Sequence, residues 1–209
     1  MITSEDEARS YIRRGWGPAA LADCSTYIEA LRQENERQNL VSPNSIEEVW
    51  VRHIADSAQL LDHHPGSCGS WGDVGSGAGL PGLIIAFLRR DLAVTLIEPR
   101  KLRADWLRQM CDTLKLRNAQ ILRSRAEDCS QTFDAISARA VAAMPELLRK
   151  TGKLGNKKAR WIFAKGRNAP AELENVSAKQ RREWMFHVKH SLTAPDARII
   201  VCERLKDFS

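Results

Sequence analysis

A run of glycines carries the clearest chemical signal in this sequence, and it spans Trp71 to Gly82 as WGDVGSGAGLPG. Starting at Asp73, the run has the form D-x-G-x-G-x-G, which is typical of loops that hold S-adenosyl-L-methionine. Starting at Gly77, it has the form G-x-G-x-x-G, the fingerprint of nicotinamide dinucleotide sites. The two registers predict different reactions, methyl transfer in the first case and hydride transfer in the second.

The local backbone favours the first register. If the turn began at Gly77, Gly75 and Ser76 would have to form the end of a strand, where glycine is a poor residue. A turn that begins at Gly75 lets the strand end at Val74, so that the glycines form the turn itself. We therefore expect Asp73, Gly75 and Gly77 to contact the cofactor.

Two positions further along the chain test this choice. Glu98 ends the next predicted strand, about 20 residues after the loop begins, where an acidic side chain can bind a ribose. Dinucleotide enzymes use the same device, so Glu98 alone does not separate the registers. Ala126 and Glu127 close the third strand, where an adenine ring would lie in a methyltransferase, and nothing after residue 140 resembles the catalytic half of a dehydrogenase. The cofactor we expect is S-adenosyl-L-methionine.

The end of the fourth predicted strand disfavours two kinds of methyl transfer. Enzymes that methylate exocyclic amines of bases carry Asn or Asp, then two prolines and an aromatic residue, where this chain has ISARA. Methylation of pyrimidine C5 needs a nucleophilic cysteine, commonly after proline, and no cysteine here follows proline. Guanine N7 has a free lone pair and no proton to lose, so its methylation requires mainly positioning. We assign no catalytic base, and expect Arg139 either to contact the methionine part of the cofactor or the acceptor guanine, or to be a surface residue that ends the strand.

Alternating strands and helices must position these residues. From residue 70 on, short apolar runs such as AVTLIE, AQILRSR and DAISARA alternate with helical stretches, and the chain closes with two β-rich runs that suit an antiparallel pair. This order predicts an α/β fold of the class I, Rossmann-like methyltransferase type, with a mostly parallel seven-stranded sheet flanked by helices. We expect residues 1–66 to form an N-terminal helical extension, and residues 67–209 to form the methyltransferase domain as a single compact unit.

Capping signals divide the helical extension. The box Ser4-x-x-Glu7 predicts a short helix that ends near Gly15, and Pro18 then begins a long one. A second box, which begins at Ser45, predicts the start of another helix that stops before Pro65.

The helix after Ser45 has polar residues on its apolar face. His53 and Ser57 lie at the centre of that face, and Arg52 and Asp56 lie at its edge, four residues apart. Because buried polar groups need partners, one interpretation is a hydrogen-bonded staple that attaches this helix to the sheet. The other is that Arg52 and His53 reach the rim of the cofactor pocket and help to seat the substrate.

Composition and charge limit the setting and the partner. The formal charge of +6 and a pI near 9.2 are compatible with a polyanionic partner. The five cysteines are scattered, which indicates a reducing compartment, and the histidines lack a metal-ligand set. No signal peptide is apparent, and the longest apolar run is too short to span a bilayer. We expect a cytoplasmic protein without a metal site and without a membrane partner.

Together these residues resemble the ribosomal RNA small-subunit methyltransferase G family, also called glucose-inhibited division protein B. The resemblance covers most of the chain and weakens after about Gly166. It implies N7-methylation of one guanosine in the decoding-region loop of 16S ribosomal RNA, with S-adenosyl-L-methionine as donor. The family pattern implies that Gly75, Leu80, Ala126, Glu127 and Arg139 contact this cofactor. The motifs that carry the resemblance are Asn39-Leu40, Arg52-His53-x-x-Asp56-Ser57, Asp73 to Gly82, Glu98-x-x-Lys101, Arg125-Ala126-Glu127, Ile136-Ser137-x-Arg139-Ala140 and Lys165-Gly166.

Basic side chains fit an RNA partner as a group. We expect Arg52, His53, Arg100, Lys101 and Lys165 to contact RNA or substrate. Further cations crowd the same regions, namely Arg103, Arg108, Lys150, Lys153, Lys157, Lys158, Arg160, Lys179, Arg181 and Arg182. Because no separate RNA-binding domain is present, we expect weak binding to isolated RNA and recognition of 16S ribosomal RNA in the small subunit or in an assembly intermediate. We also expect the protein to be a monomer.

Three other functions remain open from the sequence. One is a nicotinamide-dependent oxidoreductase that uses the Gly77 register. The second is a methyltransferase-like fold that only binds RNA or assists assembly. The third is a methyltransferase that acts on a small molecule.

Overall fold

Seven strands form one mixed sheet in the computed structural model, which describes residues 1–66 and 69–205. The order across the sheet is β3-β2-β1-β4-β5-β7-β6. β7 runs antiparallel to both of its neighbours, β5 and β6, and the other neighbouring strands are parallel. The strands are β1 (Ser70–Val74), β2 (Ala93–Ile97), β3 (Ala119–Leu122), β4 (Phe133–Arg139), β5 (Gly155–Lys165), β6 (Trp184–His190) and β7 (Arg198–Arg204). The predicted α/β class and the antiparallel final pair are confirmed. Cys68 and residue 67, where we expected the second domain to begin, lie outside the described residues.

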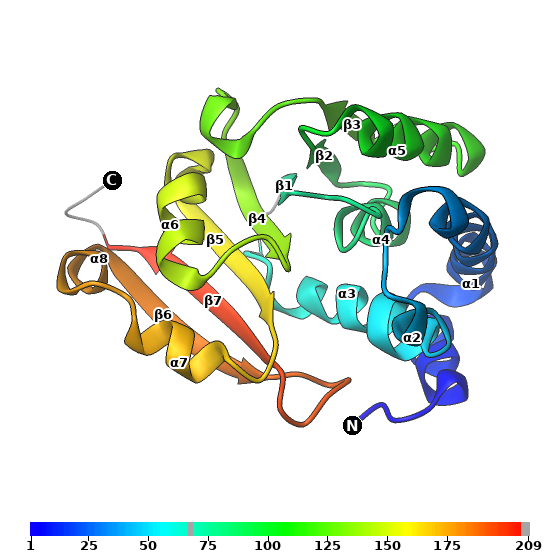
Figure 1. Ribbon diagram of the computed structural model, residues 1–209, viewed down its shortest axis with the longest axis horizontal. Coiled ribbons are helices and arrows are strands. Elements are labelled where there is room, and N and C mark those ends of the chain that lie inside the picture. The colour runs from blue at the N-terminus through cyan, green and yellow to red at the C-terminus, as the bar shows by residue number, and fades with distance from the viewer. Residues whose placement is uncertain (67–68, 206–209) are drawn as a thin grey trace.

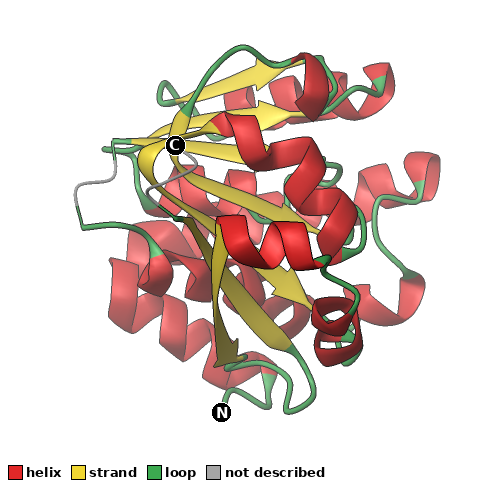
Figure 2. Cartoon of the chain, turned by 90° about the vertical axis from the view of Figure 1, so that its left-hand side faces the viewer, coloured by secondary structure: helices red, strands yellow, loops and turns green. Residues whose placement is uncertain are grey.

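Helices cover both faces of the sheet (Figure 2). On one face, α4 (Gly82–Leu88) and α5 (Lys101–Thr113) share a buried cluster with α1 (Glu5–Gln38). On the other face, α6 (Met144–Thr151) packs with α7 (Ala169–Glu174), and α8 (Ala178–Glu183) contacts α6 through the Gln180 amide, which donates to the Pro145 carbonyl at 2.8 Å. Neighbouring residues of β7 point to opposite faces, since Ile199 belongs to the first cluster and Ile200 to the second. Figure 1 shows α1, α4 and α5 on one side of the molecule and α6 to α8 on the other.

The first long helix breaks where glycine precedes proline. Ser4 caps its start, because the Ser4 hydroxyl accepts a hydrogen bond from the Glu7 N–H at 3.2 Å. The backbone leaves helical geometry at Gly17, with φ of 84°, just before Pro18. The predicted end near Gly15 was therefore two residues early, since the break needs the left-handed conformation that Gly17 adopts.

The next helical segment begins earlier than the capping signal predicted. It consists of α2 (Pro43–Ile46), a π-helical turn (Trp50–Ala55), α3 (Asp56–Ala58) and a 3₁₀ turn (Gln59–His63). The predicted cap at Ser45 was wrong: the helix starts at Pro43, and the Ser45 hydroxyl donates to the Ser42 carbonyl at 2.8 Å. In the π-helical turn, the Asp56 N–H reaches the Val51 carbonyl, five residues back. Such turns are frequent at functional sites.

The strand order marks where a ligand belongs. β2 and β3 lie on one side of β1, and β4 lies on its other side, so the strand order reverses between β1 and β4. Ligands of open α/β sheets bind outside the carboxyl ends of the strands at this switch point. Val74, Ile97 and Arg139 end their strands at this edge.

Candidate functional site

The glycine loop after β1 has the backbone that its first register predicts. Gly75, Gly77 and Gly79 all have left-handed φ angles, of 68°, 54° and 97°. Residues with a side chain rarely adopt this backbone conformation, so each of these positions requires glycine. The N–H groups of Gly75 and Ser76 both donate to the Ile97 carbonyl, at 2.8 and 3.3 Å, which holds the loop against the end of β2. The turn therefore begins at Gly75, as expected.

Asp73 lies inside the framework of the loop. It is fully buried, and its Oδ1 accepts a hydrogen bond from the Ser137 hydroxyl of β4 at 2.7 Å. Its Oδ2 accepts from the Gly82 N–H at the start of α4, at 3.2 Å. Burial raises the pKa of Asp73 to about 6, although these hydrogen bonds oppose the shift. Both oxygens thus support the loop from within the protein, and the expected contact of Asp73 with the cofactor stays a prediction.

Glu98 connects the loop to the start of α5. Its Oε2 accepts from the Gly77 N–H at 3.0 Å, and its Oε1 accepts from the Arg100 N–H at 2.9 Å. The side chain is buried, with 3% of the residue exposed. A buried carboxylate at the end of β2 is where a ribose would be bound, and a ribose here would share Glu98 with the Gly77 amide.

One carbonyl on the far side of the loop accepts two aromatic donors. The Tyr27 hydroxyl of α1 and the Trp106 indole N–H of α5 both donate to the Ala78 oxygen, at 3.1 and 3.0 Å. Tyr27 is fully buried. Neither residue could be predicted from the sequence, because helical periodicity marks both as apolar core and gives no sign of their polar partner.

The other expected cofactor residues lie around the same loop. Leu80 is buried with the helices of the first face, and Ala126 is buried in the second cluster together with Val74 and Ile97. Glu127 is half-buried beside Ala126 in a 3₁₀ turn (Ala126–Asp128). The structure thus brings these residues to the carboxyl ends of β1, β2 and β3.

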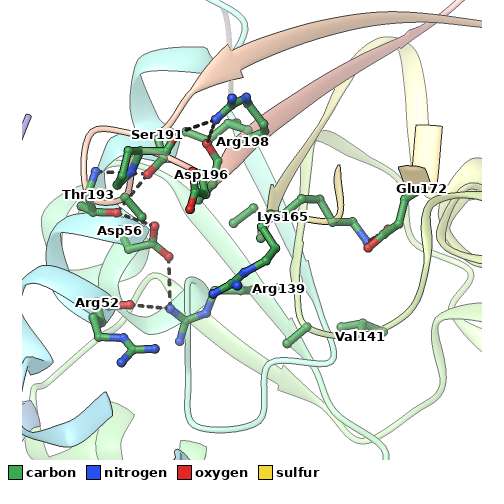
Figure 3. Close-up of a pocket in the computed structure, with 18 of the residues that line it drawn as sticks. Arg52, Asp56, Arg139, Val141, Lys165, Glu172, Ser191, Thr193, Asp196 and Arg198 are labelled. Atoms are coloured by element: carbon green, nitrogen blue, oxygen red, sulfur yellow. Dashed lines mark hydrogen bonds and ion pairs between the residues drawn. The ribbon is translucent and has the colours of Figure 1, made fainter. Parts of the chain in front are cut away.

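A cavity of about 660 Å³ opens at the same edge, beyond β4 (Figure 3). Five chain segments line it: the π-helical turn with α3, the loop after β4, the end of β5, Glu172 of α7, and the loop between β6 and β7. Of the expected substrate residues, Arg52 and Lys165 line this cavity together with Arg139, whereas His53, Arg100 and Lys101 do not. Its lining also excludes the glycine loop, Glu98, Ala126 and Glu127, so the expected site residues fall into two groups.

Arg139 is fixed by three acceptors from the π-helical segment. Its guanidinium donates to the Arg52 carbonyl at 2.9 Å, to Asp56 Oδ2 at 3.2 Å and to His53 Nδ1 at 3.1 Å. The far ring nitrogen of His53, Nε2, lies 3.0 Å from the Ser45 hydroxyl. Burial, with the nearby Arg139 charge, lowers the pKa of His53 to about 3, so the ring is neutral and can accept from Arg139 at Nδ1.

The predicted staple between this segment and the sheet is present in part. His53 and Asp56 belong to it, and Arg139 is the residue of the sheet that they hold. Ser57 does not belong to it, since its buried hydroxyl has no hydrogen-bond partner among the described residues. His53 therefore positions Arg139, and its expected contact with RNA or substrate stays a prediction.

Lys165 is occupied by the loop that follows β4. Its ammonium donates to the Ala142 carbonyl at 2.6 Å and to Glu172 Oε2 at 2.7 Å, and only 7% of its side chain is exposed. The same Glu172 oxygen accepts from the Met144 N–H at 3.0 Å. Lys165 and Glu172 thus hold this loop through two protein acceptors of the ammonium, and the expected contact of Lys165 with RNA or substrate stays a prediction.

Val141 marks the junction between the two groups of residues. A Cβ atom added to Gly75 would lie 2.7 Å from a methyl carbon of Val141, so the two residues are in close contact. Val141 also lines the cavity. A group bound on the glycine loop and a group bound in the cavity would therefore meet beside this side chain.

The basic side chains do not gather at one edge of the sheet. Arg100 and Lys101 lie at the start of α5, and an Arg103 nitrogen comes within 3.7 Å of a Cβ built on Gly77. Lys157 and Lys158 lie near the amino end of β5, the edge opposite the cavity. Only the first set adjoins the site.

Among the described residues, the structure offers neither a cluster of metal ligands nor a helix that could cross a membrane. Within residues 1–66 and 69–205, no three His, Cys, Asp or Glu side chains are close enough together to hold a metal ion. Over the same ranges, no helix combines the length and the apolar character that crossing a membrane requires.

Known proteins match the chain at the level of sequence. A family model described as rRNA small subunit methyltransferase G matches residues 20–200. A protein from Erythrobacter litoralis named ribosomal RNA small subunit methyltransferase G is 43% identical over 202 residues, which cover 96% of this chain and 97% of that protein. One with the same name from Novosphingobium aromaticivorans is 40% identical over 205 residues, covering 96% and 88%.

Solved structures match the chain at the level of fold. A ribosomal protein L11 methylase from Lactobacillus delbrueckii subsp. bulgaricus superimposes with a TM-score of 0.58 at 12% identity, over 76% of this chain and 79% of that one. A mutant of MtNAS in complex with S-adenosylmethionine superimposes with a TM-score of 0.57 at 14% identity, over 95% and 78%. The described architecture is thus the Rossmann-like methyltransferase fold, as the sequence predicted.

Proposed function

Because the chain belongs to the rRNA small subunit methyltransferase G family, we propose that it transfers a methyl group from S-adenosyl-L-methionine to N7 of a guanosine in 16S ribosomal RNA. The observation that carries this conclusion is the match to named relatives over nearly the whole chain. The start of the turn at Gly75, where φ is 68°, agrees with it, because the nicotinamide register would place Gly75 at the end of the strand.

The residues around the glycine loop fit this cofactor. A Cβ atom built on Gly77 would be in ordinary van der Waals contact with the Gly75 carbonyl and Arg103, at 3.6 and 3.7 Å. The backbone of Gly77 is therefore available for close approach by a ligand only because no side chain stands there. Glu98 offers a carboxylate for the ribose, and Ala126 and Glu127 border the place of the adenine. Gly75 and Leu80 complete the site, while Asp73 supports it from behind. When bound, the cofactor supplies an electrophilic methyl group on a positively charged sulfur.

The cavity beyond β4 receives the acceptor nucleotide. Its volume of about 660 Å³ lies within the range of small-ligand pockets. Arg52, Arg139, Arg167 and Arg198 line it and suit a phosphate-bearing ligand. Guanine N7 attacks through its own lone pair, so these residues need only hold the base in line with the methyl group and exclude water. No side chain has to remove a proton.

Arg139 orients the acceptor nucleotide from the boundary between the cofactor region at the glycine loop and the cavity beyond β4. Its three acceptors fix the guanidinium at the end of β4, beside Val141. A fixed cation loses little conformational freedom when it binds a ligand. From this place Arg139 can contact the nucleotide or the carboxylate of the methyl donor.

The physiological substrate is 16S ribosomal RNA within the small subunit or an assembly intermediate, and the protein acts as a cytoplasmic monomer. Arg100 and Lys101 are exposed next to the glycine loop and supply the nearest contacts for the RNA backbone. The described chain adds no separate RNA-binding domain to the sheet, so affinity for short naked RNA is expected to be weak.

Mapping of the modified nucleotide tests the function. Small subunits from cells that lack the gene are incubated with the protein and the methyl donor, and their RNA is then cleaved with borohydride and aniline, which cut at 7-methylguanosine. Cleavage at one new position is expected. RNA that binds without cleavage would support the non-catalytic alternative, and methylation of free nucleosides would support the small-molecule alternative.

Thermal unfolding tests the cofactor separately. S-adenosyl-homocysteine should raise the melting temperature, because a ligand that binds only the folded state stabilises it. NADH should leave the melting temperature unchanged, and stabilisation by NADH alone would restore the oxidoreductase interpretation.

A further inference from the structure

The loop between β6 and β7 is held firmly at its start. Asp56 Oδ1 accepts from the Thr193 hydroxyl at 2.9 Å. The Gln59 side chain accepts from the Leu192 N–H at 2.7 Å and donates to the Ser191 hydroxyl at 3.1 Å. The same helical segment that fixes Arg139 therefore also fixes this wall of the cavity.

The second half of the loop is held by Arg198. Its Nη1 donates to the Pro195 carbonyl at 2.7 Å and to the Ala197 carbonyl at 2.8 Å. These two carbonyls flank Asp196, so the backbone on both sides of Asp196 has a fixed position. A side chain on such a backbone is pre-organised for binding.

Asp196 differs from the other carboxylates that line the cavity. Asp56 is bound to Arg139, Thr193 and Gln59, and Glu172 is bound to Lys165 and the Met144 N–H. Asp196, by contrast, lines the cavity from an exposed position, and the described residues give its side chain no hydrogen-bond or ion-pair partner. Figure 3 shows Asp196 on the opposite side of the cavity from Val141, with Arg139 and Lys165 between them.

The chemistry of the reaction sets the orientation of the base. Guanine N7 must face the junction at Val141, because the methyl group arrives from the glycine loop. The N1–H and N2–H groups lie on the other ring of guanine, so they point away from this junction. A carboxylate can accept two such hydrogen bonds at once. Adenine presents an acceptor at N1, which a carboxylate would repel.

We propose that Asp196 accepts hydrogen bonds from N1–H and N2–H of the acceptor guanine and so selects guanine at this site. The proposal rests on the proposed function, since it takes N7 as the methylated atom. Asp196 is a specificity-determining residue and takes no part in breaking or forming the bond to the methyl group.

Single-turnover kinetics on unmethylated small subunits tests the proposal. Asp196→Asn should lower kcat/KM by roughly 10- to 100-fold, the range that a two-hydrogen-bond base contact supplies. Affinity for S-adenosyl-homocysteine and the melting temperature should not change. The matched control is Asp112→Asn on the exposed surface of α5, which removes the same charge and should stay within about 3-fold of wild type.

A change in the substrate makes the test specific to the base edge. Inosine lacks the N2 amino group but keeps N7 and N1–H, and it replaces the mapped guanosine in reconstituted subunits. The rate of wild type should fall roughly 10-fold with inosine, whereas that of Asp196→Ala should fall about 2-fold or less, because alanine leaves no side-chain acceptor for the N2 amino group. Each ratio is measured within one variant, so differences in folded fraction cancel.

The outcomes separate the two proposals. If wild type and Asp196→Ala lose activity on inosine by the same factor, or if Asp196→Asn methylates guanosine as fast as wild type, Asp196 does not recognise the base. If wild type forms no 7-methylguanosine at all, the proposed function itself fails.

Discussion

The cofactor region and the cavity are built in different ways. In the cofactor region, one continuous loop and the ends of three neighbouring strands meet, and the hydrogen bonds that shape the loop involve mainly backbone atoms. In the cavity, side chains join segments that lie far apart in the chain, as in the pairs Asp56–Arg139 and Asp56–Thr193. The first region depends on backbone conformation at a few glycines, and the second depends on a network centred on one carboxylate. Substitutions should therefore affect methyl-donor binding and acceptor use separately.

The largest effect is expected at Gly75. A Cβ atom there would lie 2.7 Å from Val141, and the φ of 68° strains any side chain. Gly75→Val should weaken binding of S-adenosyl-homocysteine by about 100-fold or more, which isothermal titration calorimetry can measure. Gly15→Ala is the control, because a Cβ atom at Gly15 meets nothing within 4 Å. Unchanged affinity in the Gly75 variant would place the cofactor elsewhere.

The second effect tests whether Arg139 belongs to the acceptor side. Asp56→Asn replaces the oxygen that faces Arg139 with an amino group, while the other oxygen can still accept from Thr193. We expect kcat/KM for small subunits to fall roughly 10- to 100-fold, because Arg139 loses a charged partner that positions it. Affinity for S-adenosyl-homocysteine should change by less than about 3-fold.

Glu48→Gln provides the comparison on the same helical segment. It removes only an exposed ion pair with Arg52, at 3.5 Å, and such pairs contribute little. If Asp56→Asn weakened cofactor affinity as strongly as catalysis, Arg139 would have to be assigned to the cofactor region.

The third effect concerns the pH dependence of stability through His53. The folded-state pKa of His53 is lowered to about 3, so the neutral ring stabilises the fold above the unfolded pKa of about 6.5. This contribution is lost as the pH falls below that value. Between pH 7 and pH 5, wild type should lose about 2 kcal/mol more of its free energy of unfolding than His53→Gln does. Urea unfolding at both pH values measures the difference, and parallel losses in the two proteins would argue against a neutral His53.

The smallest effect is expected at the aromatic donors of the cofactor region. Tyr27→Phe removes one of two hydrogen bonds to the Ala78 carbonyl and leaves that of Trp106. The free energy of unfolding should fall by about 1 kcal/mol, with a modest loss of affinity for S-adenosyl-homocysteine. Tyr11→Phe on the same helix is the matched control, since the buried Tyr11 hydroxyl has no partner among the described residues. If both variants lost the same free energy of unfolding and the same affinity for S-adenosyl-homocysteine, the hydrogen bond from Tyr27 to the Ala78 carbonyl would not be the cause.

The cofactor region follows from local sequence pattern and the cavity from long-range side-chain contacts, and this difference explains which features could be predicted from the sequence. The turn at Gly75, Glu98 at the end of β2 and the order of strands all follow from local pattern, and the structure contains them. The role of Asp73 was not predictable, because the D-x-G-x-G-x-G pattern does not show that Ser137, 64 residues away, would take one of its oxygens. The cavity was visible only as separate polar residues, since its contacts depend on how the β6–β7 loop returns to the helical segment.

Lys165 illustrates the same limit. A lysine at the end of a strand near the site resembles a phosphate ligand, and the partner that occupies it, Glu172, lies in a helix where nothing in the sequence distinguishes it from a surface residue. His53 was predictable as a buried polar residue that needs a partner, although its partner Arg139 lies 86 residues away. Residue type and periodicity thus indicated the need for a contact but not the atom that would meet it.

The Ala78 carbonyl has a consequence for anyone who would recombine this fold with another. Since Tyr27 reaches that oxygen from the first long helix, residues 1–66 help to shape the loop under the methyl donor instead of forming a detachable module. A chimera that takes its sheet from this chain and its leading helices from a distant methyltransferase would have to supply a donor at the same place. Without such a donor, the chimera would bind the methyl donor more weakly, although its sheet and glycine loop were unchanged.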